Sequence, residues 1–495
     1  MRKIYFTAIS LCIYQLGFTQ IPNLPTISRP QASGLGNYSS NDFGSSVSGR
    51  SSPRNYTPNI PNRSNSAQQQ NDYALQQSRS QNNAVMQNID RDMAEVQEMQ
   101  FREWVNNGRN MPYDLPSLSA KAGTQSYYDA FSTLSGMDSE NYSLADVNFT
   151  VENAYYDNKR DLKGFKSGIQ KTAKQLLQKM KERKQDTESN VSKNLMLFEY
   201  FSKDMKLGGT THKAFEYDFK DYMGEKDYSK MFVSKLLKTG SGQCHSMPLL
   251  YLIIAEAMGA EAHLSLAPNH SYVRFMDDEG QYRNIELTNG MFSTDTSLLE
   301  SGYIKSEALQ NKAYMENLSK NELLGMAYFD LARGYVKKFG YDEFVGKVVE
   351  KALELYPNGL APNMEKANVS QARFARVMKN LGINPENRQD LQRIGYFPKA
   401  IEQLNNVNQQ FNKIDELGYT EMPASAYESW LTSLKTEKNK QESEALAQKI
   451  YLYQRQKQID KQQQEAVRKA QEQKKKESEK SKGKAQYFPI DPTKL

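Results

Sequence analysis

The stretch GSGQCHSMPLLYLIIAEAMG, residues 240–259, holds Cys244, one of only two cysteines in the sequence of 495 residues. Glycines precede this cysteine, and a nearly continuous apolar run, residues 249–257, follows it. A helix tolerates proline in its first turn and often ends at glycine. We therefore predict a buried helix that begins near Cys244, contains Pro248 and stops at Gly259.

The sequence after this helix changes from helical to strand-like. Three short segments are rich in β-forming residues: AHLSL at 262–266, SYVRF at 271–275 and YRNIEL at 282–287. The sequences APN and DDEGQ separate them, and both are typical of turns. We therefore predict three antiparallel strands beside the buried helix, which is an α+β arrangement.

The second cysteine, Cys12, lies in a segment that looks like a leader. Arg2 and Lys3 precede an apolar run of 15 residues, 4–18, which is shorter than the roughly 20 residues needed to cross a bilayer. We predict a signal peptide over residues 1–20, export to the periplasm or the extracellular space, and no transmembrane segment. A lipoprotein signal acylated at Cys12 is the alternative, and the apolar residues that continue beyond this cysteine disfavour it.

Export would leave Cys244 as the only cysteine of the mature chain. A leftover cysteine in an oxidising compartment is typically part of an intermolecular disulfide or a reactive group. At the start of a helix, free backbone N–H groups and the helix dipole stabilise a thiolate. Cys244 is therefore a candidate nucleophile.

A cysteine nucleophile needs a base, and the chain has four histidines, His212, His245, His263 and His270. His245 adjoins the cysteine, and neighbours on a helix point about 100° apart. His270, in PNHSYVRF, begins a strand that we expect to lie against the helix, so it is the candidate base. Glu286, on the polar face of the next strand, is the candidate for orienting the imidazole, with Asn289 as the alternative.

The segment GSGQCHSMPLLYLIIAEAMGAEAHLSLAPNHSYVRF, followed by NIELTNG, resembles the transglutaminase-like superfamily of papain-type cysteine enzymes over about residues 212–295. In that family a Gly-x-Cys turn opens a helix, a histidine starts a strand, and an aspartate lies on the next strand just before a threonine. The resemblance implies a transglutaminase-like core, a buried helix on a small antiparallel sheet. It also implies the roles of nucleophile for Cys244, base and acid for His270, and orienting residue for Glu286, which stands where the family usually has aspartate.

Two functional hypotheses follow. The first is an exported cysteine enzyme that hydrolyses or transfers a peptide or cell-envelope amide through a thioester, acting on a protein or peptide-containing substrate without a cofactor. The second is a catalytically inactive scaffold of the same fold that binds proteins through its helical repeats. A metal site formed by Cys244, His245 and His270 is disfavoured, because the spacing matches no common zinc pattern.

Helices are predicted on both sides of this domain. Residues 331–358, LARGYVKKFGYDEFVGKVVEKALELYPN, are similar to a tetratricopeptide unit, a helix pair that stacks on its neighbours. We expect one or two degenerate units, and residues 320–380 are a candidate surface for a protein partner. Upstream, Phe165, Ile169 and Ala173 belong to an apolar stripe of a core-facing helix.

The two ends are polar. Residues 438–484 contain 14 Lys and Arg against 7 Asp and Glu, a local charge of 14 − 7 = +7, so the net charge of +6 comes from this segment. We interpret it as a solvated tail and expect no specific nucleic-acid binding. The predicted organisation is a signal peptide, 1–20; a disordered linker, 21–84; a helical region, 85–207; a transglutaminase-like domain, 208–300; tetratricopeptide-like helices, 301–400; a helical extension, 401–436; and a charged tail, 437–495.

Overall fold

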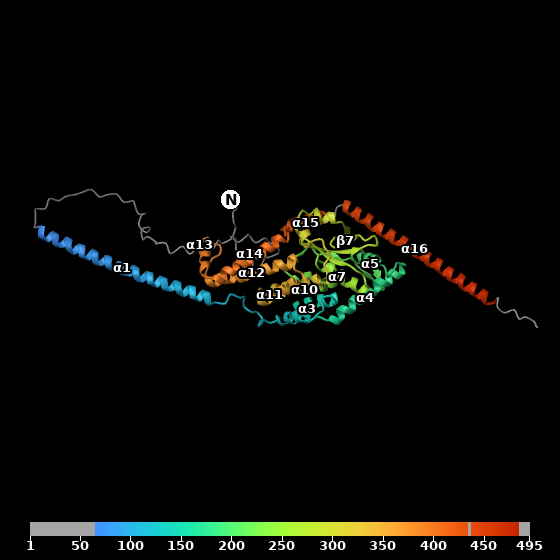
Figure 1. Ribbon diagram of the computed structural model, residues 1–495, viewed down its shortest axis with the longest axis horizontal. Coiled ribbons are helices and arrows are strands. Elements are labelled where there is room, and N and C mark those ends of the chain that lie inside the picture. Colours follow the sequence, from blue (N-terminus) through green and yellow to red (C-terminus); the bar gives the residue numbers. More distant parts are fainter. Residues whose placement is uncertain (1–64, 434–436, 485–495) are drawn as a thin grey trace, which may run out of the picture. The chain divides into compact units, whose positions relative to one another are not determined.

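The structure is a computed structural model that describes residues 65–433 and 437–484 (Figure 1). The described residues divide into two compact units. The larger unit contains residues 115–372, 407–433 and 437–484, and the smaller one contains 65–114 and 373–406. The predicted signal peptide with Cys12, and the predicted linker up to residue 64, lie outside the described residues.

Helix α7, Ser246–Met258, lies in the centre of the larger unit. Most of its apolar residues are buried, and Gly259 ends the helix with the left-handed conformation (φ 63°) that glycine adopts without strain. Helices α4, α5 and α6 contact it, as do strands β5 and β6. The predicted buried helix with its glycine stop is therefore confirmed, and Cys244 lies two residues before the first helical residue.

The strands after α7 form one antiparallel sheet in the order β5-β6-β7-β8. Their bounds are β5, His263–Ala267; β6, His270–Met276; β7, Tyr282–Glu286; and β8, Met291–Ser293. The three predicted strands are present, and β8 is a fourth that the sequence did not indicate because it has only three residues. The mixed α+β character is thus confirmed.

Two small strand pairs border this sheet and α7. The antiparallel pair is β1, Met205–Leu207, with β2, Thr210–His212, and the parallel pair is β3, Glu216–Tyr217, with β4, Ser241–Gly242. Because β4 directly precedes the turn that holds Cys244, its pairing with β3 fixes the approach of the chain to that turn.

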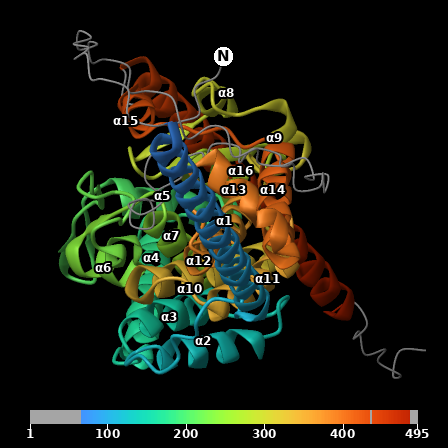
Figure 2. The same ribbon diagram turned by 90° about the vertical axis from the view of Figure 1, so that its left-hand side faces the viewer.

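Most of the helices on either side of the sheet share one core with it. Those before the sheet are α2, Gln125–Ser135; α3, Leu144–Tyr155; α4, Leu162–Glu182; α5, Asn190–Ser202; the 3-10 helix η2, Tyr228–Met231; and α6, Val233–Thr239. Those after it are α8, Asp295–Leu299; α9, Ser306–Gln310; α10, Lys320–Phe339; α11, Glu343–Leu355; and α12, Leu360–Leu381. Figure 2 shows α2, α3 and α10 lying together, and buried residues from all three belong to the same core cluster as those of α7. Within the larger unit, the parts of the predicted regions 85–207, 208–300 and 301–400 that lie in residues 115–372 are therefore not separate, because they contribute to one core.

The predicted helix pair after the sheet is present as α10 and α11. A capping box at Ser319 and Glu322 starts α10, and Asp342 caps α11 by accepting hydrogen bonds from the N–H groups of Phe344 and Val345. The buried Tyr335 ring packs 5.1 Å from the ring of Phe344. That the pair is a tetratricopeptide unit stays a prediction.

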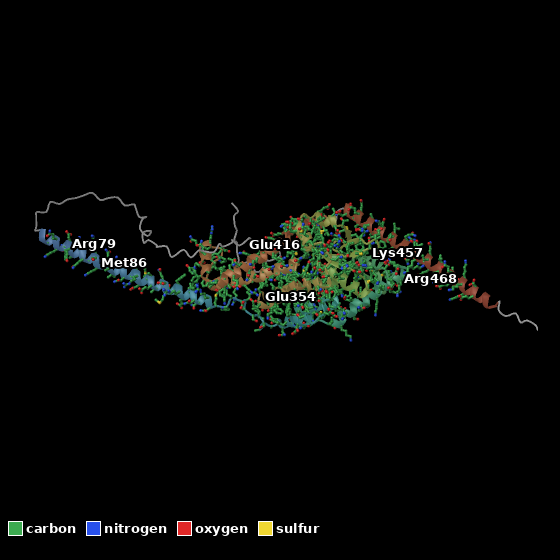
Figure 3. The ribbon with its side chains drawn as sticks, in the orientation of Figure 1. Arg79, Met86, Glu354, Glu416, Lys457 and Arg468 are labelled. Carbon is green, nitrogen blue, oxygen red and sulfur yellow. The ribbon has the colours of Figure 1, made fainter. Side chains whose placement is uncertain are left out.

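The helices after α12 are α13, Arg388–Gln392; the 3-10 helix η3, Arg393–Tyr396; α14, Pro398–Glu416; α15, Ala424–Ser433; and α16, Glu437–Lys484. Helix α16 covers most of the predicted charged tail. Its first half is not free in solvent, since Ile450 is buried and Ser443 Oγ accepts a hydrogen bond of 2.9 Å from the N–H of Phe292 in β8. Lys457 and Arg468, further along, project from the helix (Figure 3).

In the smaller unit, α1, Asn65–Asn110, corrects the predicted linker of 21–84, because residues 65–84 are helical. Proline and glycine concentrate before residue 65, and neither occurs from 65 to 107, so this segment is rich in helix-forming Gln and Ala. Arg79 and Met86 project from the helix into solvent (Figure 3). Across the described residues, no helix is both long and apolar enough to cross a membrane.

Candidate active site

Cys244 lies in the turn between β4 and α7, and two hydrogen bonds and the close packing at Gly242 fix that turn. The N–H of Gln243 donates to Ser246 Oγ at 2.9 Å, and Ser271 Oγ donates to the carbonyl oxygen of Cys244 at 2.5 Å. A Cβ at Gly242 would lie 2.9 Å from both Leu236 and Met247, so only glycine fits before the turn. The side chain of Cys244 is thereby held at the start of the helix.

His270 begins β6, next to Cys244. The preceding residue, Asn269, has φ 56°, which asparagine tolerates better than most residues, and its carbonyl oxygen lies 3.8 Å from the sulfur of Cys244. Hydrogen bonding between His270 and Cys244 acts on the pKa of both groups. The structure thus brings together the two residues that we predicted as nucleophile and base.

Glu286 lies at the end of β7 and holds the far side of the imidazole. Its Oε2 is 2.5 Å from His270 Nε2, and its Oε1 accepts hydrogen bonds from Thr288, at 3.0 Å from N–H and 2.5 Å from Oγ1. Both oxygens of the carboxylate are therefore used. Asn289, the alternative, does not fill this role, since the ring nitrogen that it would contact is bonded to Glu286.

Burial and charge together set the protonation states of these three groups. Burial raises the pKa of Cys244. Hydrogen bonding to His270 and the charge of its imidazolium lower this pKa by a larger amount, so the net shift is downward. Burial lowers the pKa of His270, but the charge of Glu286 and the bond to Cys244 outweigh it and raise the pKa to about 10. Burial raises the pKa of Glu286, and the charge of His270 reverses this, so the net shift is also downward. The geometry therefore favours a buried thiolate, imidazolium and carboxylate.

Three aromatic residues that the sequence did not indicate complete the site. Tyr427, on α15, places its hydroxyl 3.2 Å from His270 Nδ1 and 3.3 Å from the hydroxyl of Tyr217 in β3. Trp430, one turn further along α15, packs its ring against the imidazole, edge on, with 5.1 Å between ring centroids. Tyr427 and Trp430 are three residues apart, and this spacing is the only feature of the local sequence that places both on the same face of a helix.

The other three histidines have separate partners. His245 Nε2 lies 3.1 Å from Oδ2 of Asp330 on α10. Burial lowers the pKa of His245, but the charge of Asp330 raises it by more, so the net shift is upward and favours the charged ring next to the cysteine. His212 Nε2 bonds the carbonyl oxygen of Tyr200, and His263 pairs with Glu261.

Among the described residues, the side chains around Cys244 do not have the arrangement of a metal site. The structure describes residues 65–433 and 437–484, and among them no group of three or more His, Cys, Asp or Glu side chains could hold a metal ion.

Comparisons of the chain with protein-family models, with curated proteins and with solved structures found no significant match.

Proposed function

We propose that this chain is a transglutaminase-like cysteine enzyme that acts on an amide bond through a thioester. One observation carries the proposal: Cys244, His270 and Glu286 are buried together before α7, where Glu286 is hydrogen-bonded to the imidazole and the imidazole lowers the pKa of the thiol. The order of a cysteine at a helix start, a histidine opening a strand and a carboxylate on the next strand supports the same superfamily.

The chemistry follows from the charges. The Cys244 thiolate attacks the carbonyl carbon of the amide, and the backbone N–H groups at the helix start stabilise the oxyanion. His270, as imidazolium, gives its proton to the leaving nitrogen when the C–N bond breaks, which releases an amine and leaves a thioester. His270, now neutral, takes a proton from water or from an acceptor amine that attacks the thioester, and the thiolate is restored.

Glu286 maintains this cycle without touching the substrate. Its negative charge stabilises the imidazolium, and its two bonds to Thr288 stop the carboxylate from turning away. Glutamate is one methylene longer than the aspartate of the superfamily, and Oε2 nevertheless lies at hydrogen-bond distance from the ring. The longer side chain is therefore compatible with the proposed role.

Acylation by an activated ester tests the proposal without knowledge of the natural substrate. We expect incubation with p-nitrophenyl acetate to add one acetyl group at Cys244, seen by intact-mass spectrometry and removed by hydroxylamine. The reaction is expected to disappear in Cys244→Ala and to slow by about 10²-fold or more in His270→Ala. Equal acylation of the wild type and His270→Ala would contradict the proposal.

The burial of the site favours a second candidate, a non-catalytic scaffold. Cys244 is 7% exposed and the His270 side chain 0%. In that case the series of charges would serve the stability of the fold, and protein partners would bind elsewhere, for example on residues 320–380. Deleting that segment cannot test this, because Leu331 and Tyr335 of α10 belong to the main core. The scaffold candidate instead predicts that partner binding survives in His270→Ala while hydroxylamine-sensitive acylation is absent in every variant.

Export and the substrate class belong to the same proposal. We propose a protein or peptide-containing substrate outside the cytoplasm, on the basis of the leader-like residues 1–20 and the single remaining thiol. The cysteine chemistry needs no cofactor.

A further inference from the structure

We propose that α15 occupies the substrate-binding face beside Cys244 and His270, and that an amide reaches the thiol only when α15 moves away. The inference rests on the proposed function, because it takes the covered thiol to be the nucleophile. It goes beyond that function by assigning a regulatory role to a helix outside the predicted domain of residues 208–300.

The two ring nitrogens of His270 have different partners. Nε2 is bonded to Glu286, so only Nδ1 can exchange a proton with the sulfur or with a leaving amine. The hydroxyl of Tyr427 lies 3.2 Å from that nitrogen and occupies the position that a leaving amine would need. Acyl transfer and the present position of Tyr427 are therefore mutually exclusive.

The approach to the sulfur of Cys244 is filled by aromatic rings of α15. A carbonyl carbon must come within about 3–3.5 Å of the sulfur before it can react. Tyr427 is 0% exposed and Trp430 is 7% exposed, and both lie against the imidazole, so aromatic rings fill the approach to the Cys–His pair. A reagent such as p-nitrophenyl acetate or iodoacetamide therefore reaches the sulfur of the wild type only while α15 is locally open.

Helix α15 packs against the rest of the larger unit outside the main core. Its buried residues Tyr427, Trp430 and Leu431 are not part of the main core. They pack with Ala267, Tyr272, Leu298 and Met422 in a smaller cluster. Besides the hydroxyl of Tyr427, several hydrogen bonds anchor the segment, one of them between Glu428 of α15 and Tyr222. Trp430 Nε1 donates to the carbonyl oxygen of Ser297 at 3.2 Å, and Asn269 Nδ2 donates to that of Met422 at 2.8 Å. A helix of 10 residues that packs in a small cluster outside the main core is expected to open locally, at a free energy well below that of global unfolding.

The surface on which α15 packs also indicates what kind of substrate segment would bind there once the helix has moved away. Ala267, Tyr272 and Leu298 are apolar or aromatic, and Tyr217 and Tyr222 border them. The incoming group that fits such a surface is a polypeptide segment with apolar or aromatic side chains next to the reacting amide. Tyr427 and Trp430 fill the place of such side chains in the closed form.

Alkylation of Cys244 by iodoacetamide at a fixed pH of about 7 tests the inference directly. We expect slow alkylation of the full-length wild type and an increase of at least about tenfold in Tyr427→Ala/Trp430→Ala, because the opening step is removed. Trp430→Phe keeps an aromatic ring and loses only the bond to Ser297, so it should give a smaller increase while leaving the fold intact. Wild type and Trp430→Phe reacting at the same rate as the double variant would overturn the inference.

Two matched variants separate opening from general loss of stability. Tyr314→Ala removes a buried tyrosine from a different cluster, and Tyr453→Ala removes an exposed one from α16, so neither should change the alkylation rate. A tenfold increase in Tyr314→Ala would mean that any destabilisation exposes the thiol, and this also would overturn the inference.

The same data distinguish failure of this inference from failure of the proposed function. If α15 covers an ordinary thiol, the double variant reacts faster but with the pH midpoint of about 8.5 typical of free cysteine. If the thiol is activated and α15 does not cover it, the midpoint lies lower and the wild type reacts as fast as the double variant.

Discussion

Nε2 of His270 lies 2.5 Å from Oε2 of Glu286, and neither side chain is more than 1% exposed to solvent. Two opposite charges this close are strongly coupled when water is excluded from them, so each holds the other in its ionised form. The state of Cys244 depends on this pair, since the imidazolium is the charge that lowers the pKa of the thiol.

Replacing Glu286 by glutamine should therefore weaken the thiolate. The amide keeps nearly the same shape but carries no charge, so the pKa of His270 falls from about 10 toward its ordinary 6.5 and the pKa of Cys244 rises. We expect the rate of Cys244 alkylation at pH about 6 to fall by roughly tenfold or more, measured in the open Tyr427→Ala/Trp430→Ala background. Glu152→Gln, another buried carboxylate, serves as a control for loss of stability, and an equal effect in this control would contradict the role of Glu286.

The stability of the fold should depend on pH in a defined window. The pKa of Glu286 is lowered on folding, so its contribution is present above the ordinary value of 4.5 and is lost as the pH falls further. The pKa of His270 is raised from 6.5 to about 10, so its contribution is complete below 6.5 and is lost as the pH rises toward 10. Urea unfolding of the wild type and of Glu286→Gln should differ most between pH 4.5 and 6.5, and a constant difference from pH 4.5 to 10 would contradict the pairing.

Asp330 should lower the pKa of Cys244 indirectly, through its ion pair with His245. Its Oδ2 lies 3.1 Å from His245 Nε2 and raises the pKa of that ring, and the charge of His245 is one of the causes that lower the pKa of the thiol. Asp330→Asn should raise the pH midpoint of alkylation, but by less than His270→Ala does. Asp92→Asn, on the exposed face of α1, should leave the midpoint unchanged. No shift in Asp330→Asn would show that the His245–Asp330 pair serves packing alone.

Gly242 should not tolerate a methyl group. A Cβ there would meet Leu236 and Met247 at 2.9 Å, so Gly242→Ala is expected to cost about 1–3 kcal/mol of unfolding free energy in urea. Gly168 lies on the exposed side of α4, and a Cβ added to it would have no atom within 4 Å, so Gly168→Ala should instead stabilise by about 0.5–1 kcal/mol. Equal effects of the two substitutions would contradict the close packing before Cys244.

The sequence predicted the parts of the fold that local patterns encode. The apolar run with its glycine stop predicted α7, and the β-rich segments between turns predicted three strands of the sheet. The order along the chain then indicated His270 and Glu286 as neighbours of Cys244, because consecutive antiparallel strands lie side by side.

What the sequence did not predict depends on contacts between distant parts of the chain. Tyr427 is 157 residues from His270, and nothing near SAYESWL marks its helix as the cover of a site elsewhere. The shared core of helices before and after the sheet was missed for the same reason, since each helix alone shows only which face is apolar. The start of α1 was missed because composition was averaged over a segment whose proline and glycine lie in its first part.

The most direct test of the central claim is the pKa of Cys244, measured from the ultraviolet absorbance of its thiolate as a function of pH, with Cys244→Ala as the blank. This measurement needs no reagent to pass α15. The account predicts a midpoint well below about 8.5 in the wild type and a midpoint at or above that value in His270→Ala, where the buried thiol has lost its imidazolium. A wild-type thiol that is still protonated at a pH of about 7.5, or a midpoint that His270→Ala leaves unchanged, would contradict the account.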